Sequence, residues 1–163
     1  MANASLPELL RLYVNVLHEL VRREFVRSTN NPVADLSEYL VVKALGLTRV
    51  KKSTKGFDAT DDKTGMKYEI KARRATSHNP SRMLSAIRDI EARHFDYLVG
   101  VLFSETFDLS KACIVPFETV RSLSKHRPHV NAAIFELKDS VWSLPGVTDI
   151  TDKIRAVFER LEG

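Results

Sequence analysis

Three side chains in the middle of the chain could do chemistry together. Asp58 precedes a short polar turn at residues 61–65, and Glu69 and Lys71 follow it. Side chains alternate between the two faces of a β-strand, so Glu69 and Lys71 share a face if their segment is extended. A hairpin closed at the turn then brings Asp58 alongside them. The spacing therefore predicts two carboxylates and an ammonium group on one polar surface.

This set of side chains has the chemistry needed to hydrolyse a phosphodiester. Carboxylate oxygens suit Mg²⁺, which takes one or two protein carboxylates and keeps several waters. A metal ion on Asp58 and Glu69 would neutralise phosphoryl oxygens and acidify the attacking water. Lys71 would hold that water or stabilise the developing negative charge. No Cys/His set at zinc spacing competes, so we expect a magnesium enzyme that accepts Mn²⁺ and needs no small-molecule cofactor.

These residues resemble the PD-(D/E)XK nuclease superfamily, the restriction-endonuclease-like fold of type II restriction enzymes, resolvases and repair nucleases. The match consists of Glu38 in the first core helix, Asp58 at a strand, and Glu69-x-Lys71 on the next strand. The resemblance implies that Lys71 positions the attacking water. Phe57 stands where the family has a proline, at a position that is not a ligand.

The resemblance covers roughly residues 34–104 and also implies a set of metal ligands. Asp58 and Glu69 would bind the magnesium ion directly. The backbone carbonyl of Ile70 would be a further ligand. Glu38 would reach the metal directly or through a water.

The elements expected to position these residues form an α/β fold. Apolar residues recur at helical spacing near both ends of the chain and alternate or run continuously in between. Helices are expected at residues 6–27, 35–46, 81–93, 117–123 and 151–161. Strands are expected at residues 48–52, 56–60, 66–73, 97–103, 112–115, 132–137 and 141–143. This order predicts a restriction-endonuclease-like core, with a mixed β-sheet flanked by helices.

Two of these strands carry most of the argument. In residues 66–73, Tyr68, Ile70 and Ala72 are expected on one face of the strand, and Glu69, Lys71 and Arg73 on the other. Residues 97–103 are continuously apolar, which predicts a central strand buried on both faces.

Positive charge is concentrated around the expected site. The chain has a net charge of +4, and residues 43–74 hold ten Lys or Arg and four Asp or Glu, a local charge of +6. A compact basic surface suits a polyanion, because each phosphate contact releases counterions. The expected DNA contacts are Lys51, Lys52, Lys55, Arg73, Arg74, His78, Asn79, Ser81 and Arg82. Arg73 ranks first because it shares a face with Glu69 and Lys71; a merely solubilising surface is the alternative.

Length and composition place limits on the organisation. The 163 residues fit one nuclease domain over 1–163. Within it, residues 1–33 hold an apolar helix suited to a dimer interface, 34–104 the catalytic core, and 105–163 the last strands and helix. The single cysteine, Cys113, excludes an intramolecular disulfide. With no signal peptide or membrane-spanning run, we expect a cytoplasmic protein.

The function expected from these observations is magnesium-dependent cleavage of DNA, by a sequence-specific type II restriction endonuclease acting as a homodimer. A Holliday junction resolvase or a DNA repair nuclease would need the same residues. An alternative of another class is a non-catalytic DNA-binding protein or a subunit of a larger complex. The least specific alternative is an unrelated α/β domain with a lysine-rich hairpin.

Overall fold

The computed structural model describes residues 4–51, 56–128 and 131–161. Its helices are α1 (Leu6–Arg22), α2 (Val33–Leu45), α3 (Phe117–Leu123) and α4 (Thr151–Glu159), with 3₁₀ helices η1 (Ile90–Ala92) and η3 (Asp139–Ser143). Its strands are β1 (Thr48–Arg49), β2 (Ala59–Thr60), β3 (Lys67–Arg74), β4 (Ile87–Arg88), β5 (Tyr97–Phe103), β6 (Leu109–Pro116), β7 (Lys125–Arg127), β8 (Ala132–Ile134) and β9 (Thr148–Asp149).

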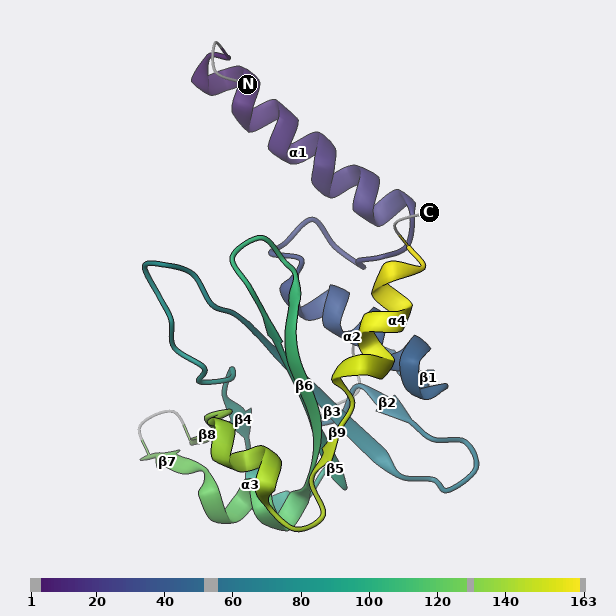
Figure 1. Cartoon of the computed structure of the whole chain (residues 1–163), viewed down its shortest axis with the longest axis vertical. Coiled ribbons are helices and arrows are strands. Elements are labelled where there is room, and N and C mark those ends of the chain that lie inside the picture. Colours follow the sequence, from purple (N-terminus) through teal and green to yellow (C-terminus); the bar gives the residue numbers. More distant parts are fainter. Residues whose placement is uncertain (1–3, 52–55, 129–130, 162–163) are drawn as a thin grey trace.

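Six strands form a mixed sheet in the order β1-β2-β3-β5-β6-β9 (Figure 1). β3 and β5 run parallel, with Tyr68 opposite Tyr97 and Arg74 opposite Phe103. The other neighbouring pairs are antiparallel. The α/β class and the mixed sheet flanked by helices are therefore as expected. β5 is the predicted central strand, since every residue after Tyr97 is buried.

Apolar side chains pack on both faces of this sheet. The helices α2 and α4 cover one face, and the core beneath them includes Leu40, Val99 and Ile154. The helix α3 and the segments around β4 and β8 cover the other face, with Leu98 and Val120 in that core. Neighbouring residues of β5 thus belong to different cores, as alternation along a strand requires.

The predicted faces of β3 are confirmed. Tyr68, Ile70 and Ala72 pack into the core beneath α2 and α4. Alternation then places Glu69 and Lys71 on the opposite face of the sheet. This is the face over which the chain crosses from β3 to β5.

A crossover is required because two parallel strands cannot be joined by a tight hairpin. Residues 75–96 form it and contain β4 and η1. β4 pairs with β8, and β8 with β7, in a second, three-stranded antiparallel sheet. The crossover therefore lies over the polar side chains of β3.

The prediction of a helix at residues 81–93 is wrong. Leu84, Ile87 and Ile90 have helical spacing, but they enter the core from extended and 3₁₀ backbone. The amide of Leu84 donates to the carbonyl of Phe135 at 2.9 Å, a long-range bond that replaces a helical one. Pairing with a distant segment has overridden the local periodicity.

Other boundaries differ in detail. The first helix ends at Arg22 instead of residue 27. Gly46 ends α2 as predicted, with a left-handed φ of 65°. The strand expected at 132–137 ends at Ile134. Residues 141–143 are 3₁₀ helix and not strand, which corrects the last expected strand.

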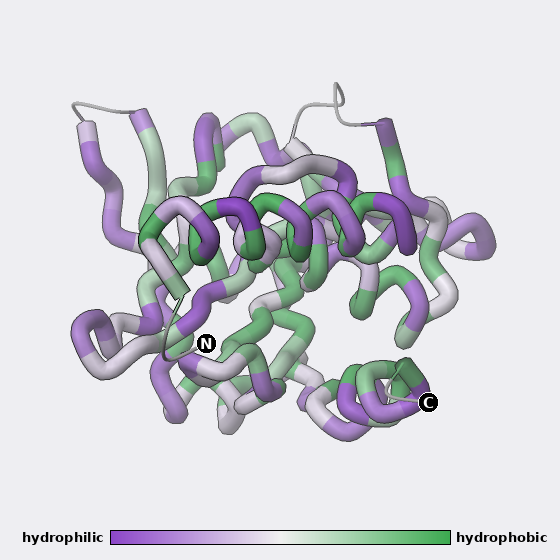
Figure 2. The backbone as a smooth tube through the Cα atoms, turned by 90° about the horizontal axis from the view of Figure 1, so that it is seen from above, coloured by the Kyte–Doolittle hydropathy of each residue, from purple (hydrophilic) through white to green (hydrophobic). Residues whose placement is uncertain are grey.

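α1 lies along the outside of the molecule with its N-terminal half extending away from the sheets (Figure 1). Hydrophobic and hydrophilic residues alternate along it (Figure 2). Leu17 is its one buried residue, whereas Leu6 is 69% and Tyr13 57% exposed. A capping box begins the helix, in which the Ser5 amide donates to the Glu8 carboxylate at 2.7 Å. Within the described ranges, no helix has the length and apolarity needed to cross a membrane.

Gly100 gives a test of the packing in the centre of β5. A Cβ at this position would lie 2.5 Å from Cδ1 of Leu137. We therefore expect Gly100→Ala to lower the free energy of unfolding by about 1–3 kcal/mol through overpacking. Urea unfolding measures this. In the Leu137→Ala background the same substitution should cost less, and an equal cost in both backgrounds would contradict the packing explanation.

Candidate active site

The hairpin of β2 and β3 places Asp58 beside β3. The amide of Asp58 donates to the carbonyl of Tyr68 at 2.8 Å. The amide of Ile70 donates to Oδ2 of Asp58 at 2.7 Å. The Asp58 carboxylate is thus held against the backbone between Glu69 and Lys71, as the spacing predicted.

Glu69 and Lys71 form an ion pair on the polar face of β3. Nζ of Lys71 lies 2.6 Å from Oε1 of Glu69, and the two side chains are only 17% and 11% exposed. Lys71 is mostly buried next to the carboxylates of Glu69 and Asp58, so its ammonium group has a defined position.

The carboxylates outnumber the cation, and Asp58 shows the effect. Burial and the negative charge of Glu69 raise the pKa of Asp58 to about 6, while the amide of Ile70 and the charge of Lys71 act in the opposite direction. Two adjacent carboxylates resist simultaneous ionisation unless more positive charge is supplied. The pair therefore favours a proton or another cation at this point.

Glu38, on α2, lies near enough to Asp58 for their charges to interact. Its carboxylate binds Arg27, and Oε2 lies 2.9 Å from Nη2 of Arg49. Burial, followed by the charge of Asp58, raises the pKa of Glu38, and the two arginines lower it. The structure thus brings Glu38 near Asp58, but two arginines hold it and it does not line the cavity described next.

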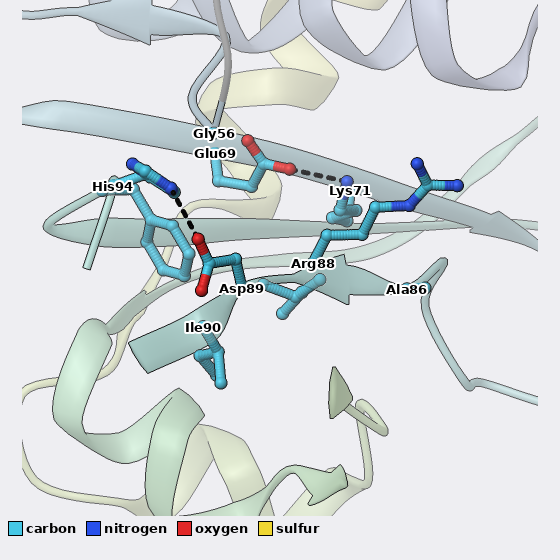
Figure 3. Close-up of a pocket in the computed structure, with 10 residues that line it drawn as sticks. Gly56, Glu69, Lys71, Ala86, Arg88, Asp89, Ile90 and His94 are labelled. Atoms are coloured by element: carbon cyan, nitrogen blue, oxygen red, sulfur yellow. Dashed lines mark ion pairs between the residues drawn. The ribbon is translucent and has the colours of Figure 1, made fainter. Parts of the chain in front are cut away.

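A cavity of about 500 Å³ opens beside Glu69 and Lys71 (Figure 3). Its opposite wall comes from the crossover, including Arg88, Asp89 and His94. Nε2 of His94 lies 3.6 Å from Oδ2 of Asp89. The cavity therefore has carboxylates and cations on both walls.

Gly56 fits this wall closely. Its φ is +85°, and a Cβ there would lie 2.2 Å from Cβ of His94. Only glycine combines this backbone conformation with so close an approach. Gly56 thus sets how near the crossover comes to the segment that carries Asp58.

The donor set fits magnesium better than a metal that needs a full protein cage. Among residues 4–51, 56–128 and 131–161, no three His, Cys, Asp or Glu side chains group closely enough to hold a metal ion. Magnesium takes one or two carboxylates and fills its other positions with water and phosphate. Asp58 and Glu69, two carboxylates that share one lysine, are the residues that would hold such an ion. The carbonyl of Ile70 as a ligand stays a prediction.

The predicted DNA contacts of the basic stretch differ in their exposure and in their partners. Lys51 is exposed, while Lys52 and Lys55 lie outside the described residues. Nε of Arg73 donates to the carbonyl of Ser81 at 3.1 Å, so Arg73 holds the crossover loop. Arg74 follows on the opposite face, 4.6 Å from the ring centroid of Phe107, and so lies away from the cavity.

The loop after β3 does not form the expected helix N-terminus. His78 and Asn79 are exposed. The Ser81 hydroxyl accepts from the amide of Met83 at 3.2 Å, and Nη1 of Arg82 lies 3.0 Å from Oδ1 of Asp139. The expected phosphate site at a helix start is therefore absent, although these side chains stay available at the surface.

Sequence reasoning missed three residues that line the cavity: Arg88, Asp89 and His94. Arg88 and Asp89 lie in the segment expected to be helical and His94 directly follows it, so their approach to β3 could not be foreseen. Asp89 and Arg93 adopt left-handed backbone, with φ of 51° and 48°. The one sequence signal was Gly56, two residues before Asp58.

A comparison of the chain with protein-family models finds no match, and a comparison with curated proteins finds no relative.

The pKa of Asp58 predicts a pH-dependent gain from Asp58→Asn in protein kept in EDTA. Its pKa rises from an ordinary 3.8 to about 6 on folding, so ionisation costs stability above that range. The isosteric amide keeps an acceptor for Ile70 and removes the charge. We expect a gain of about 1–3 kcal/mol at pH 8 that disappears as the pH falls through 6 towards 4.

Urea unfolding at several pH values measures this gain. Asp61→Asn in the adjacent turn is the control, because hydrogen bonds from the Lys63 amide and the Thr64 hydroxyl lower the pKa of Asp61. This control should lose stability at pH 8 or stay unchanged. A loss of stability in Asp58→Asn at pH 8 would contradict the assigned pKa.

Proposed function

We propose that the chain is a magnesium-dependent endodeoxyribonuclease with a restriction-endonuclease-like core, which hydrolyses phosphodiester bonds of DNA. The observation that carries the proposal is the meeting of Asp58, Glu69 and Lys71 beside an open cavity. Manganese is expected to substitute for magnesium. The unpaired buried thiol of Cys113 and a DNA substrate favour the cytoplasm as the place of action.

Each side chain has a role in the proposed reaction. Asp58 and Glu69 would hold the metal ion, which when bound neutralises phosphoryl oxygens and acidifies a nearby water. Lys71, released in part from Glu69, would orient the attacking water and stabilise charge on the phosphate. Glu38 would act at a distance, since its arginines already neutralise it.

A restriction enzyme is the leading candidate, and a junction resolvase or repair nuclease uses the same site. A non-catalytic DNA-binding protein is less favoured, because half-burying Asp58, Glu69 and Lys71 together costs stability that binding alone does not require. A solvated lysine-rich hairpin does not account for them either, since the Glu69 and Lys71 side chains are 11% and 17% exposed.

We propose that a second copy of the chain covers α1. Leu6, Leu10, Tyr13, Leu17 and Leu20 follow a four-three spacing, the seam of a coiled coil. The helix of 17 residues spans about 25 Å. Most side chains of this seam are exposed to solvent. A stable interface buries about 800 Å² of surface on each partner.

An antiparallel pair of α1 helices would cover two apolar surfaces at once. A groove of about 590 Å³ runs beside the C-terminal half of α1, lined by Leu20, Phe25, Leu36 and Phe158 among others. Leu6 and Leu10, in the N-terminal half of α1, are exposed and line no such groove among the described residues. Antiparallel pairing lays the bare half of one helix over the groove of the other copy, and two-fold symmetry repeats the contact. Two active sites in one particle could then cut both strands.

The proposed activity is tested with purified protein, supercoiled plasmid and long linear DNA, with magnesium and with EDTA. We expect cleavage that requires magnesium and that falls about 10²–10⁴-fold in Lys71→Ala, which loses the charge at the phosphate. Lys63→Ala, in the exposed turn after β2, is the charge-matched control and should cut at the wild-type rate.

The products of this assay separate the alternatives. Discrete fragments indicate a sequence-specific enzyme, and nicking or degradation indicates resolution or repair. Cleavage that is equal in wild type and Lys71→Ala would rule out the proposed site.

Leu10→Glu combined with Tyr13→Glu tests the assembly. Both side chains are exposed, so the fold should survive, while two buried carboxylates per copy would break the interface. Light scattering after gel filtration should give the mass of two copies for wild type and one for the variant. Arg11→Glu, on the polar side of α1, should stay a dimer. A monomeric wild type would exclude the arrangement.

A further inference from the structure

The register of the three-stranded sheet shows which side chains of β4, β8 and β7 lie on the same face. Arg88 of β4 lies opposite Ala132 of β8, which lies opposite Arg127 of β7. Residues paired directly across antiparallel strands point to the same side. Arg88 and Arg127 therefore share a face, and alternation adds Lys125. Ile87, one residue from Arg88, points into the core instead.

These three cations, the basic row, are Arg88, Lys125 and Arg127, and all are exposed. Within the part of the chain that the structure describes, none of them forms an ion pair or a side-chain hydrogen bond. Arg88 extends across the cavity toward the strand that carries Lys71 (Figure 3). Lys71 is already paired with Glu69, whereas Arg88 is exposed and has no acidic partner among the described residues, so its guanidinium group can bind an anion.

Nearby acidic side chains already have partners. Asp89 pairs with His94, and Oε2 of Glu91 lies 2.6 Å from Nη2 of Arg121. Oε2 of Glu136 lies 3.5 Å from Nζ of Lys138. Neither these carboxylates nor Asp58 and Glu69 form an ion pair with the basic row among the described residues, so its three exposed cations are available to an anion.

We propose that the basic row holds the phosphates of one DNA strand as it leaves the cavity. The nature of the polyanion rests on the proposed function; the row itself does not. β4 and β7 are two strand spacings apart, about 10 Å, a length comparable to about three nucleotides at a rise of 3.4 Å along the axis of a duplex. Arg88 and Arg127 lie at the two ends of this distance, and Lys125 lies two residues from Arg127 along β7. Three cations spread over such a distance suit a chain of phosphates better than one small anion. The crossover is then the substrate-binding wall, and β3 the catalytic wall.

The test is binding of a fluorescent oligonucleotide, single-stranded and duplex, in EDTA over a series of salt concentrations. The row variant is Arg88→Ala, Lys125→Ala and Arg127→Ala together. The charge-matched control is Lys63→Ala, Lys153→Ala and Arg160→Ala, three exposed cations on the hairpin turn, on α4 and directly after α4. The three single substitutions of the row are measured as well, so that the result does not depend on one triple variant.

We expect the row variant to raise the dissociation constant at least about tenfold and to flatten the dependence of log K on log salt by about 2–3, one for each lost phosphate contact. The control should change the constant by less than about threefold, through long-range charge alone. Equal changes in the two triple variants, or no binding of either oligonucleotide by wild type, would overturn the proposal.

Cleavage of plasmid by the same proteins in magnesium separates this inference from the function. If wild type cuts and the row variant binds like the control, the basic row fails and the nuclease stands. If wild type binds but does not cut, and the row variant loses binding, the nuclease fails and the basic row stands.

Discussion

The parallel pairing of β3 and β5 is the constraint on which the rest of the structure depends. It forces residues 75–96 across one face of the main sheet. That face carries the polar side chains of β3, so the crossover becomes the second wall of a cavity instead of a cover over a core. An antiparallel hairpin at this point would have left Glu69 and Lys71 on an open surface.

The buried carboxylates near the sheet edge differ in the number of cations that accompany them. Glu38 is buried with two arginine partners, which lower its pKa, although burial and the charge of Asp58 keep that pKa above its ordinary value. Asp58 and Glu69 share one lysine, and the pKa of Asp58 rises accordingly. A folded chain gains no stability from such an imbalance, and imbalances of this kind are typical of sites that bind or react.

The parts of the site that depend on local alternation could be predicted from the sequence. The two faces of β3, the hairpin that brings Asp58 to Glu69, and the buried β5 all follow from a period of two. The prediction that Gly46 ends a helix was correct, because a left-handed glycine at a helix end is a local property of the sequence.

The parts that depend on distant pairing could not be predicted. Residues 81–93 have helical spacing, yet β8 offers backbone partners that make the segment extended. Arg88 and His94 therefore reached the cavity unseen, and Arg82, a predicted DNA contact, forms a surface ion pair with Asp139. Nothing near these residues in the sequence encodes the position of a strand that follows some forty residues later.

The alternation of β3 also ties the chemistry to the completion of folding. A slip of one residue in the pairing of β3 would turn Ile70 toward the cavity and bury Lys71 among apolar side chains. The same register that closes the core beneath α2 therefore presents the lysine on the other side. A chain in which β3 is misregistered has neither a closed core nor the candidate site, so both depend on the register of one strand.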